Sequence, residues 1–416
     1  MTRNWSVALA LLGLAACAGG TETPPAIPRT AAVTSASAWS GAEVMVVSPS
    51  FTGVDSLPVV TVEGAMAQTR RVSAGTVAVR LPSLPGTYRI SVHFHAGDTT
   101  LAGTVTTAGG FNGILQGPPN DATMFAWPDP NGATVLDYKS TLLNLSSGAT
   151  SSLPVADSLA DATCLLQGPG PAAGGGVVVG GAPNCLWRVA MPDGSIADSM
   201  PSSGDQYAVY FGPGRWLGWA NGPGWFSRTS QSFQPIVQWG APPVVVSAGT
   251  DWAVPLHGVG SGGIPVFNTH TMSVAYTIPG INDAGGAFSP QGDTLFLFTR
   301  DPTTLYRLLV LRASDGSVLA ADSTTVYASE PFMALDPSRP WLYVWGSAGP
   351  PSAPVVTVID RRSMQVVTQL LIPAASWVAP PPNTHTYTLF VDATARRLYL
   401  HEEYQSGRIL VYDLLP

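Results

Sequence analysis

The chain has 416 residues, carries a formal net charge of −7 at pH 7, and only 11% of its residues are charged. This balance gives no basis for attraction to nucleic acid or to anionic membrane surfaces, so neither is expected as a partner on electrostatic grounds. The 44 Gly and 38 Pro residues forbid long helices, and the length suggests about two domains. We therefore expect an all-β protein.

The N-terminus has the pattern of a secretion signal. Arg3 is followed by an apolar run from Ser6 to Ala16, which is too short to span a bilayer because spanning needs about 20 apolar residues. The run ends in Leu14-Ala-Ala-Cys17, which resembles the lipobox of bacterial lipoproteins. The resemblance implies that residues 1–17 form a lipoprotein signal peptide with its lipobox and that Cys17 is lipidated and begins the mature chain. The alternative is an ordinary signal peptide cleaved nearby, with Cys17 incidental.

Ala18 stands where lipoproteins retained in the inner membrane usually have Asp. The expected location is therefore the cell envelope, with the protein lipid-anchored in the outer membrane and facing the periplasm or the cell surface. Residues 18–37 are rich in Gly, Thr, Pro and Ala and are predicted to be a flexible tether, since they can bury little apolar surface. No later segment qualifies as a transmembrane helix.

Residues 38–99 contain alternating strand patterns separated by turn-rich pieces, the spacing expected of a small Ig-like β-sandwich. Ser48-Pro-Ser-Phe, followed later by Leu-Pro and Gly-Thr-Tyr, resembles bacterial Ig-like modules of the IPT/TIG type. Such modules usually act as spacers, and we expect that role here.

A repeat runs from residue 111 to the end of the sequence, with an apolar run, a turn containing Pro, Gly or Asp, and a second aromatic-aliphatic run. It recurs seven times, about 44 residues apart, which is the size of a four-stranded propeller blade. The paired runs begin at Gly113 and Met124, Cys164 and Val177, Ala208 and Trp216, Val244 and Trp252, Gly286 and Leu295, Met333 and Trp341, and Phe390 and Leu398.

One such sheet cannot bury both of its faces alone, but a ring of them can, so residues 100–416 are predicted to form a seven-bladed β-propeller. The pattern of an apolar residue, Pro or Asp, Gly, Arg and then aliphatic-Tyr-Val resembles the surface-layer-type (YVTN-like) repeats of lactonase-like and quinoprotein-like propellers. The last repeat lacks residues for a fourth strand. We therefore expect the strand at about 101–107 to close the ring by pairing with Ile409 to Tyr412.

Few residues suggest chemistry. Cys164 and Cys185 are predicted to form a disulfide, which an oxidising compartment permits. His93 and His95 alternate on one strand and could share a metal, but no third ligand is evident, so a polar strand face is the better interpretation. His401-Glu402-Glu403 is read as a solvated loop. No metal site, cofactor or catalytic residue is predicted.

Aromatic residues gather between 207 and 252. Trp216, Trp219 and Trp225 could stack on sugar rings or on a protein partner if they are exposed. The better interpretation is that these large side chains fill the wedge between neighbouring blades.

The leading functional hypothesis is a non-enzymatic, monomeric envelope lipoprotein whose propeller binds an unknown envelope protein or glycan. The first alternative is a lactonase-like hydrolase or isomerase working at the propeller channel mouth, where Asp283, Asp301, Glu330 and His385 would be the residues to inspect. The second alternative is a structural role in envelope assembly.

Overall fold

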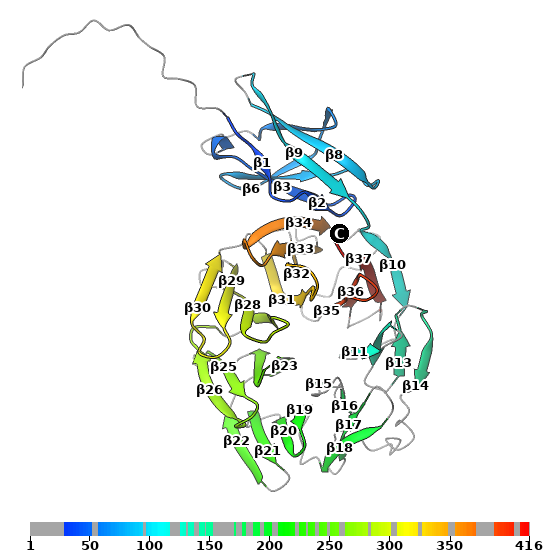
Figure 1. Ribbon diagram of the computed structural model, residues 1–416, viewed down its shortest axis with the longest axis vertical. Coiled ribbons are helices and arrows are strands. Elements are labelled where there is room, and N and C mark those ends of the chain that lie inside the picture. The colour runs from blue at the N-terminus through cyan, green and yellow to red at the C-terminus, as the bar shows by residue number, and fades with distance from the viewer. Residues whose placement is uncertain are drawn as a thin grey trace, which may run out of the picture.

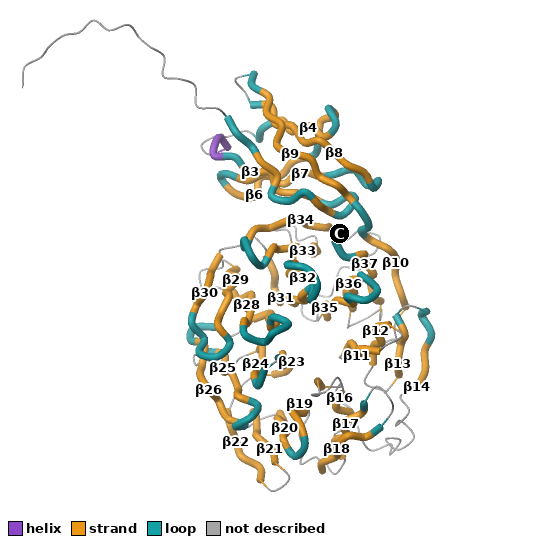
Figure 2. Tube along the Cα trace, in the orientation of Figure 1, coloured by secondary structure: helices purple, strands orange, loops and turns teal. Residues whose placement is uncertain are grey.

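The computed structural model describes most of the chain beyond residue 28. The described residues are 29–51, 57–94, 97–116, 125–129, 132–136, 141–145, 147–152, 170–171, 177–179, 186–191, 195–201, 207–220, 224–229, 232–237, 241–247, 250–257, 263–281, 284–300, 306–322, 327–347, 354–371, 387–402 and 408–415. All regular elements in these ranges are β-strands except one short 3-10 helix, η1 (Pro49–Phe51), drawn in purple in Figure 2. No helix in the described part of the chain is long and apolar enough to cross a membrane.

The first structural unit is a two-sheet sandwich, here called the N-terminal sandwich (residues 29–110). Its two sheets face each other across a core to which both contribute, including Val44 and Val79 from one sheet and Ile90 and Val105 from the other. One sheet has the order β1 (Ala32–Val33), β3 (Glu43–Val47), β7 (Thr76–Arg80) and β6 (Thr69–Ser73), and the other β2 (Ser37–Ala38), β9 (Thr99–Thr107), β8 (Gly86–His93), β4 (Val59–Val62) and β5 (Ala65–Met66).

The remaining described strands form seven four-stranded antiparallel units, here called the ring. In chain order the first four units are β11 (Phe125–Asp129), β12 (Gly132–Leu136), β13 (Thr141–Asn144) and β14 (Thr150–Ser152); β15 (Gly170–Pro171), β16 (Val177–Val179), β17 (Leu186–Ala190) and β18 (Ile196–Pro201); β19 (Tyr207–Gly212), β20 (Arg215–Ala220), β21 (Gly224–Thr229) and β22 (Ser232–Val237); and β23 (Ala241–Val246), β24 (Trp252–His257), β25 (Ile264–Asn268) and β26 (Ser273–Ile278). The last three are β27 (Ala284–Phe288), β28 (Thr294–Arg300), β29 (Tyr306–Arg312) and β30 (Val318–Asp322); β31 (Tyr327–Leu335), β32 (Trp341–Ser347), β33 (Pro354–Asp360) and β34 (Gln365–Leu371); and β35 (Tyr387–Asp392), β36 (Arg397–Glu402) and β37 (Arg408–Asp413) with β10 (Phe111–Gln116).

These sheets follow one another around a common centre, and the N-terminal sandwich sits at the rim (Figure 1). The β27–β30 sheet buries apolar side chains on both faces, as β28 shows. Leu295 and Leu297 pack towards the β23–β26 sheet, whereas Phe296 and Phe298 point to the opposite face and pack towards the β31–β34 sheet. Because successive side chains of a strand point to opposite faces, a continuous apolar run is what a sheet covered on both sides requires.

The closing strand differs from the expected one. Residues 101–107 belong to β9, which pairs with β8 and β2 inside the N-terminal sandwich. The strand that pairs with β37 is β10, in which Phe111 lies opposite Tyr412 and Gln116 lies opposite Arg408. The expectation was therefore right that a strand from the N-terminal side completes the last sheet, but wrong about which one, because β10 contains the first run of the predicted first repeat and residues 101–107 do not take part.

The physical reason lies in the turn between β9 and β10. Gly109 and Gly110 have φ of +61° and +121°, values that L side chains rarely adopt, and they turn the chain out of the sandwich into the ring. The apolar run at Gly113, expected to begin the first repeat, consequently belongs to the last sheet. The run at Met124 continues into β11, the first strand of the next sheet.

The boundaries of the first unit also need correction. The sandwich sheets extend from Ala32 to Thr107, rather than over residues 38–99. The expected tether at 18–37 is therefore structured in its last part, since β1 and the start of β2 are sheet strands and Thr34 donates a hydrogen bond to the Val366 carbonyl (2.8 Å).

Candidate functional site

The best-defined constellation of polar and aromatic side chains is the junction between the N-terminal sandwich and the ring. Strand β3 of the sandwich pairs antiparallel with β34, the outer strand of a ring sheet, with Glu43 opposite Gln369 and Val44 opposite Thr368. The Thr368 hydroxyl also donates to the Glu43 carbonyl at 2.5 Å. One eight-stranded sheet therefore runs from the ring into the sandwich.

An ion pair reinforces this pairing. Arg70 on β6 donates to the Glu43 carboxylate at 2.7 Å and to the Gln369 side-chain carbonyl at 3.0 Å. The Gln369 amide in turn donates to the Thr357 hydroxyl at 3.1 Å. Each member of this chain of groups has a hydrogen-bond partner, and Glu43, Gln369 and Thr357 are buried, so none of these three buried polar side chains is left unpaired.

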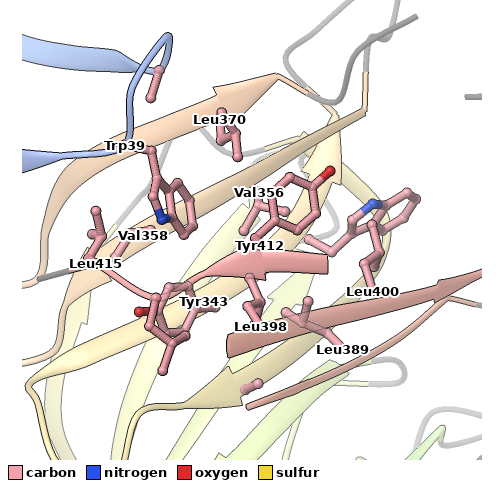
Figure 3. Packing of buried hydrophobic residues seen from close by; sticks show 14 of the residues in the cluster. Trp39, Tyr343, Val356, Val358, Leu370, Leu389, Leu398, Leu400, Tyr412 and Leu415 are labelled. Carbon is pink, nitrogen blue, oxygen red and sulfur yellow. The ribbon is translucent and has the colours of Figure 1, made fainter. Parts of the chain in front are cut away.

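Trp39 inserts from the sandwich into the ring (Figure 3). Its side chain is fully buried, and its ring centroid lies 5.9 Å from that of Tyr343 and 6.3 Å from that of Tyr412. The indole N–H donates to the Asp413 carbonyl. The surrounding apolar cluster comes almost entirely from the β31–β34 and β35–β37 sheets and from Leu414 and Leu415, so Trp39 anchors the sandwich to two neighbouring ring sheets.

A second polar network lies at the turns beside this cluster. The buried Asp336 carboxylate accepts hydrogen bonds from the Ser338 amide (2.9 Å) and hydroxyl (2.6 Å) and pairs with Arg396 at 2.8 Å. Burial alone would raise the pKa of Asp336, but the bonds from Ser338 and Arg396 together hold the pKa below its ordinary value. Arg396 also donates to the Leu415 carbonyl at 2.6 Å, which links the end of the chain to two ring sheets.

The tryptophans proposed as an aromatic surface are only partly described. Trp216 on β20 is 1% exposed and packs edge-on against Tyr210, with ring centroids 4.8 Å apart. Burial raises the pKa of the Tyr210 phenol, and the charge of Asp198 adds to the effect. Trp219 and Trp225 face each other in the backbone register of β20 and β21, but their side chains lie outside the described residues. Trp216 thus serves packing.

Both ring nitrogens of His93, which was considered as a metal ligand, are within hydrogen-bond distance of threonine hydroxyls. Its Nε2 lies 3.0 Å from the Thr61 hydroxyl and its Nδ1 lies 2.9 Å from the Thr99 hydroxyl, so both ring nitrogens have partners within the sheet. Over the described ranges, no group of three or more His, Cys, Asp or Glu residues could hold a metal ion.

The other sequence candidates cannot be placed. The residues that fall outside the described part of the chain, wholly or in their side chains, are Cys17, His95, Cys164, Cys185, Asp283, Asp301, Glu330, His385, His401, Glu402 and Glu403. Of these, Glu330, His401 and Glu402 lie on strands β31 and β36 by their backbone. The predicted lipidation, the predicted disulfide and the channel-mouth residues therefore remain predictions.

Sequence reasoning missed the groups that hold the junction together. Trp39, Glu43 and Arg70 lie within the predicted sandwich, but no local pattern distinguishes a strand that pairs with another domain from one at a free edge. Asp336-Pro-Ser338 lies in one of the predicted turns, but its link to Arg396 depends on 60 residues of intervening chain.

Comparison with known proteins is informative about the fold. No family model matches the chain, and no curated protein matches it. A chain of the mitotic checkpoint complex matches with a TM-score of 0.52 and 11% identity, covering 73% of this chain and 93% of its own.

Two further solved structures cover nearly the whole chain at lower similarity. A structural genomics protein of unknown function from Bacteroides thetaiotaomicron has a TM-score of 0.39 and 13% identity, covering 94% of this chain and 99% of its own. An auxiliary nutrient binding protein from Bacteroides ovatus has a TM-score of 0.36 and 10% identity, covering 93% of this chain and 98% of its own. The chain is therefore an all-β protein of many four-stranded antiparallel sheets that resembles β-propeller-containing proteins.

Proposed function

We propose that this chain is an exported lipoprotein of the bacterial cell envelope, in which an Ig-like module and a seven-bladed β-propeller form one rigid body that binds an envelope protein or glycan without catalysis. The observation that carries the proposal is the β3–β34 pairing, with Trp39 buried beside it. A module that only separated two domains would need no shared sheet, whereas a binding surface held at a set position relative to an anchor does.

The propeller assignment is supported by the seven four-stranded units in the described part of the chain and by the burial of both faces of the β27–β30 sheet. The seven recurrences and the likeness to surface-layer-type (YVTN-like) repeats point the same way. This likeness indicates architecture, and propellers with this architecture support many unrelated functions.

The envelope assignment is supported by the sequence Leu14-Ala-Ala-Cys17, which resembles a lipobox. The Arg29 carbonyl accepts a bond from the Thr100 hydroxyl (2.8 Å), and the Arg29 guanidinium lies 5.7 Å from the centroid of the Phe94 ring. Thr100 is near the start of β9, whose far end leads into β10 and the ring, so the chain enters at the end of the sandwich away from the ring (Figure 1). An anchor at Cys17 would place the sandwich between the lipid and the ring.

Two experiments test the proposal. Cells supplied with labelled palmitate should incorporate label into the wild-type chain and not into a Cys17→Ser variant, and label in the variant would refute the anchor. The purified chain should bind a defined glycan or peptide in an array without turning it over. Measurable turnover that one point substitution abolishes would replace the binding function with an enzymatic one.

A further inference from the structure

Arginine side chains gather at three turns that meet beside the junction. Arg339 lies in the β31–β32 turn and is exposed, whereas Arg361 and Arg362 lie in the β33–β34 turn and are half-buried and exposed, respectively. The Arg361 amide donates to the Pro340 carbonyl at 2.9 Å, which holds these two turns against each other. Arg396, in the β35–β36 turn, reaches the same place through the Ser338 hydroxyl at 3.1 Å.

The positive charge of these four arginines is only partly compensated by neighbouring carboxylates. The Asp336 carboxylate is occupied by Ser338 and Arg396, and Asp360 caps its own turn by accepting from the Arg362 amide at 2.8 Å. Among the described residues, no acidic side chain forms an ion pair with Arg339, Arg361 or Arg362.

The titration of neighbouring groups agrees with this picture. Burial lowers the pKa of Arg361, the charge of Arg362 lowers it further, and the smaller opposing effects of Asp336 and Asp360 do not cancel them. Burial raises the pKa of the Tyr343 phenol, and the charges of Arg396 and Arg339 both oppose that rise. In a chain with a net charge of −7 and only 19 basic residues, this concentration of uncompensated arginine is unusual.

We propose that Arg339, Arg361 and Arg362 form a binding site for a phosphate group. A guanidinium presents its donors in a planar fork that matches the oxygens of a phosphate, and arginines from two turns that contact each other offer several such forks to one polyvalent oxyanion. Arg361 supplies a half-buried cation whose solvation is already reduced, while Arg339 and Arg362 approach from the solvent side. This proposal does not rest on the partner or glycan binding proposed for the ring, so either proposal can fail without the other.

The test titrates the purified full chain with pyrophosphate at low ionic strength and follows the heat of binding. The variant R339Q/R362Q removes two exposed cations and should leave folding intact, since neither side chain is buried. The matched control is Arg312→Gln, which changes an arginine at the equivalent turn of the preceding sheet, where it pairs with Asp315 at 3.3 Å.

We expect saturable binding that weakens at least tenfold in R339Q/R362Q, stays within a factor of two in the control, and falls as salt is raised because the contacts are electrostatic. Arg361→Gln, checked by its melting temperature, should weaken binding comparably. The absence of saturable binding to the wild type, or equal affinities for wild type and R339Q/R362Q, would overturn the proposal.

Vesicles distinguish a free phosphate compound from a lipid headgroup as the source. The lipid anchor should attach the chain to vesicles of phosphatidylcholine and of phosphatidylglycerol alike. Attachment alone therefore does not report on the site, and the measurement is whether phosphatidylglycerol vesicles compete with pyrophosphate for it. Competition seen only with phosphatidylglycerol assigns a lipid headgroup, and pyrophosphate binding unchanged by either vesicle assigns a soluble phosphate compound.

Discussion

At the scale of single residues, Trp39 is the largest contribution of the sandwich to the ring. It is fully buried among side chains from two sheets that lie some 300 residues further along the chain. Replacing it with Ala would leave a cavity and would remove the donor to the Asp413 carbonyl. A buried Trp→Ala change costs about 3 to 5 kcal/mol.

We therefore expect Trp39→Ala to lower the urea midpoint of unfolding strongly, measured by tryptophan fluorescence. Leu84→Ala is the control, because Leu84 is 71% exposed and its loss should change stability by no more than about 0.5 kcal/mol. Similar midpoints for the two variants would contradict the role assigned to Trp39.

Asp336 gives the molecule a predictable sensitivity to acid. Its pKa in the folded protein lies below the ordinary value of 3.8, because Ser338 and Arg396 favour the charged form. A carboxylate of this kind contributes its full stabilisation above the unfolded pKa and loses it as the pH falls through the lower, folded value.

Urea midpoints measured from about pH 5 to about pH 2 should therefore fall more steeply for the wild type than for Asp336→Asn. At pH 7 the variant should be less stable by about 2 kcal/mol, less than for a fully buried pair because Arg396 is 35% exposed. Parallel pH profiles for the two proteins would show that this carboxylate does not control the acid response.

At the scale of elements, four of the described turns between third and fourth strands share one geometry. Gly148, Met272, Gly316 and Met364 each lie four residues after the last residue of a third strand and have φ between +54° and +70°. In three of these turns the residue's amide donates back to the carbonyl four residues earlier, at 2.7 to 2.9 Å.

Gly148 and Gly316 allow the effect of backbone strain on stability to be separated from the effect of a side-chain contact. A Cβ at Gly148 would meet nothing within 4 Å, so Gly148→Ala should cost only the strain of a left-handed conformation, about 1 kcal/mol. A Cβ at Gly316 would lie 2.5 Å from the Tyr276 ring, which is held by its hydroxyl bond to the Ala313 carbonyl (2.7 Å). We expect Gly316→Ala to lower the melting temperature clearly more than Gly148→Ala, and equal shifts would argue against the contact.

The sequence was informative where local pattern decides the structure. The paired runs beginning at Ala208, Val244, Gly286, Met333 and Phe390 coincide with the first two strands of five ring sheets. The predicted closing strand was wrong because β9 and β10 are consecutive strands, and which of them completes the last sheet depends on a partner about 300 residues away. The pairing of β3 with β34 had no sequence signal, since edge strands carry no code for a distant partner.

At the scale of the whole molecule, the sandwich and the ring are bound as closely as two parts of one domain. They share a sheet through Glu43 and Val44, and the chain connecting them continues directly from β9 into the closing strand β10. Domains joined by flexible linkers unfold separately, whereas units that share a core and a sheet unfold together.

Calorimetry of the full chain should therefore show one main transition that includes the sandwich, rather than an early transition for its roughly 80 residues. The variant Trp39→Ala combined with Arg70→Gln removes the aromatic anchor and the ion pair to Glu43 while leaving the sandwich core unchanged. In that variant the transition should divide in two, with the ring melting at the lower temperature because closure through β10 is no longer supported from the sandwich side. Two transitions already present in the wild type would show that the modules are energetically independent and that the shared sheet does not hold the ring at a set position relative to the anchor.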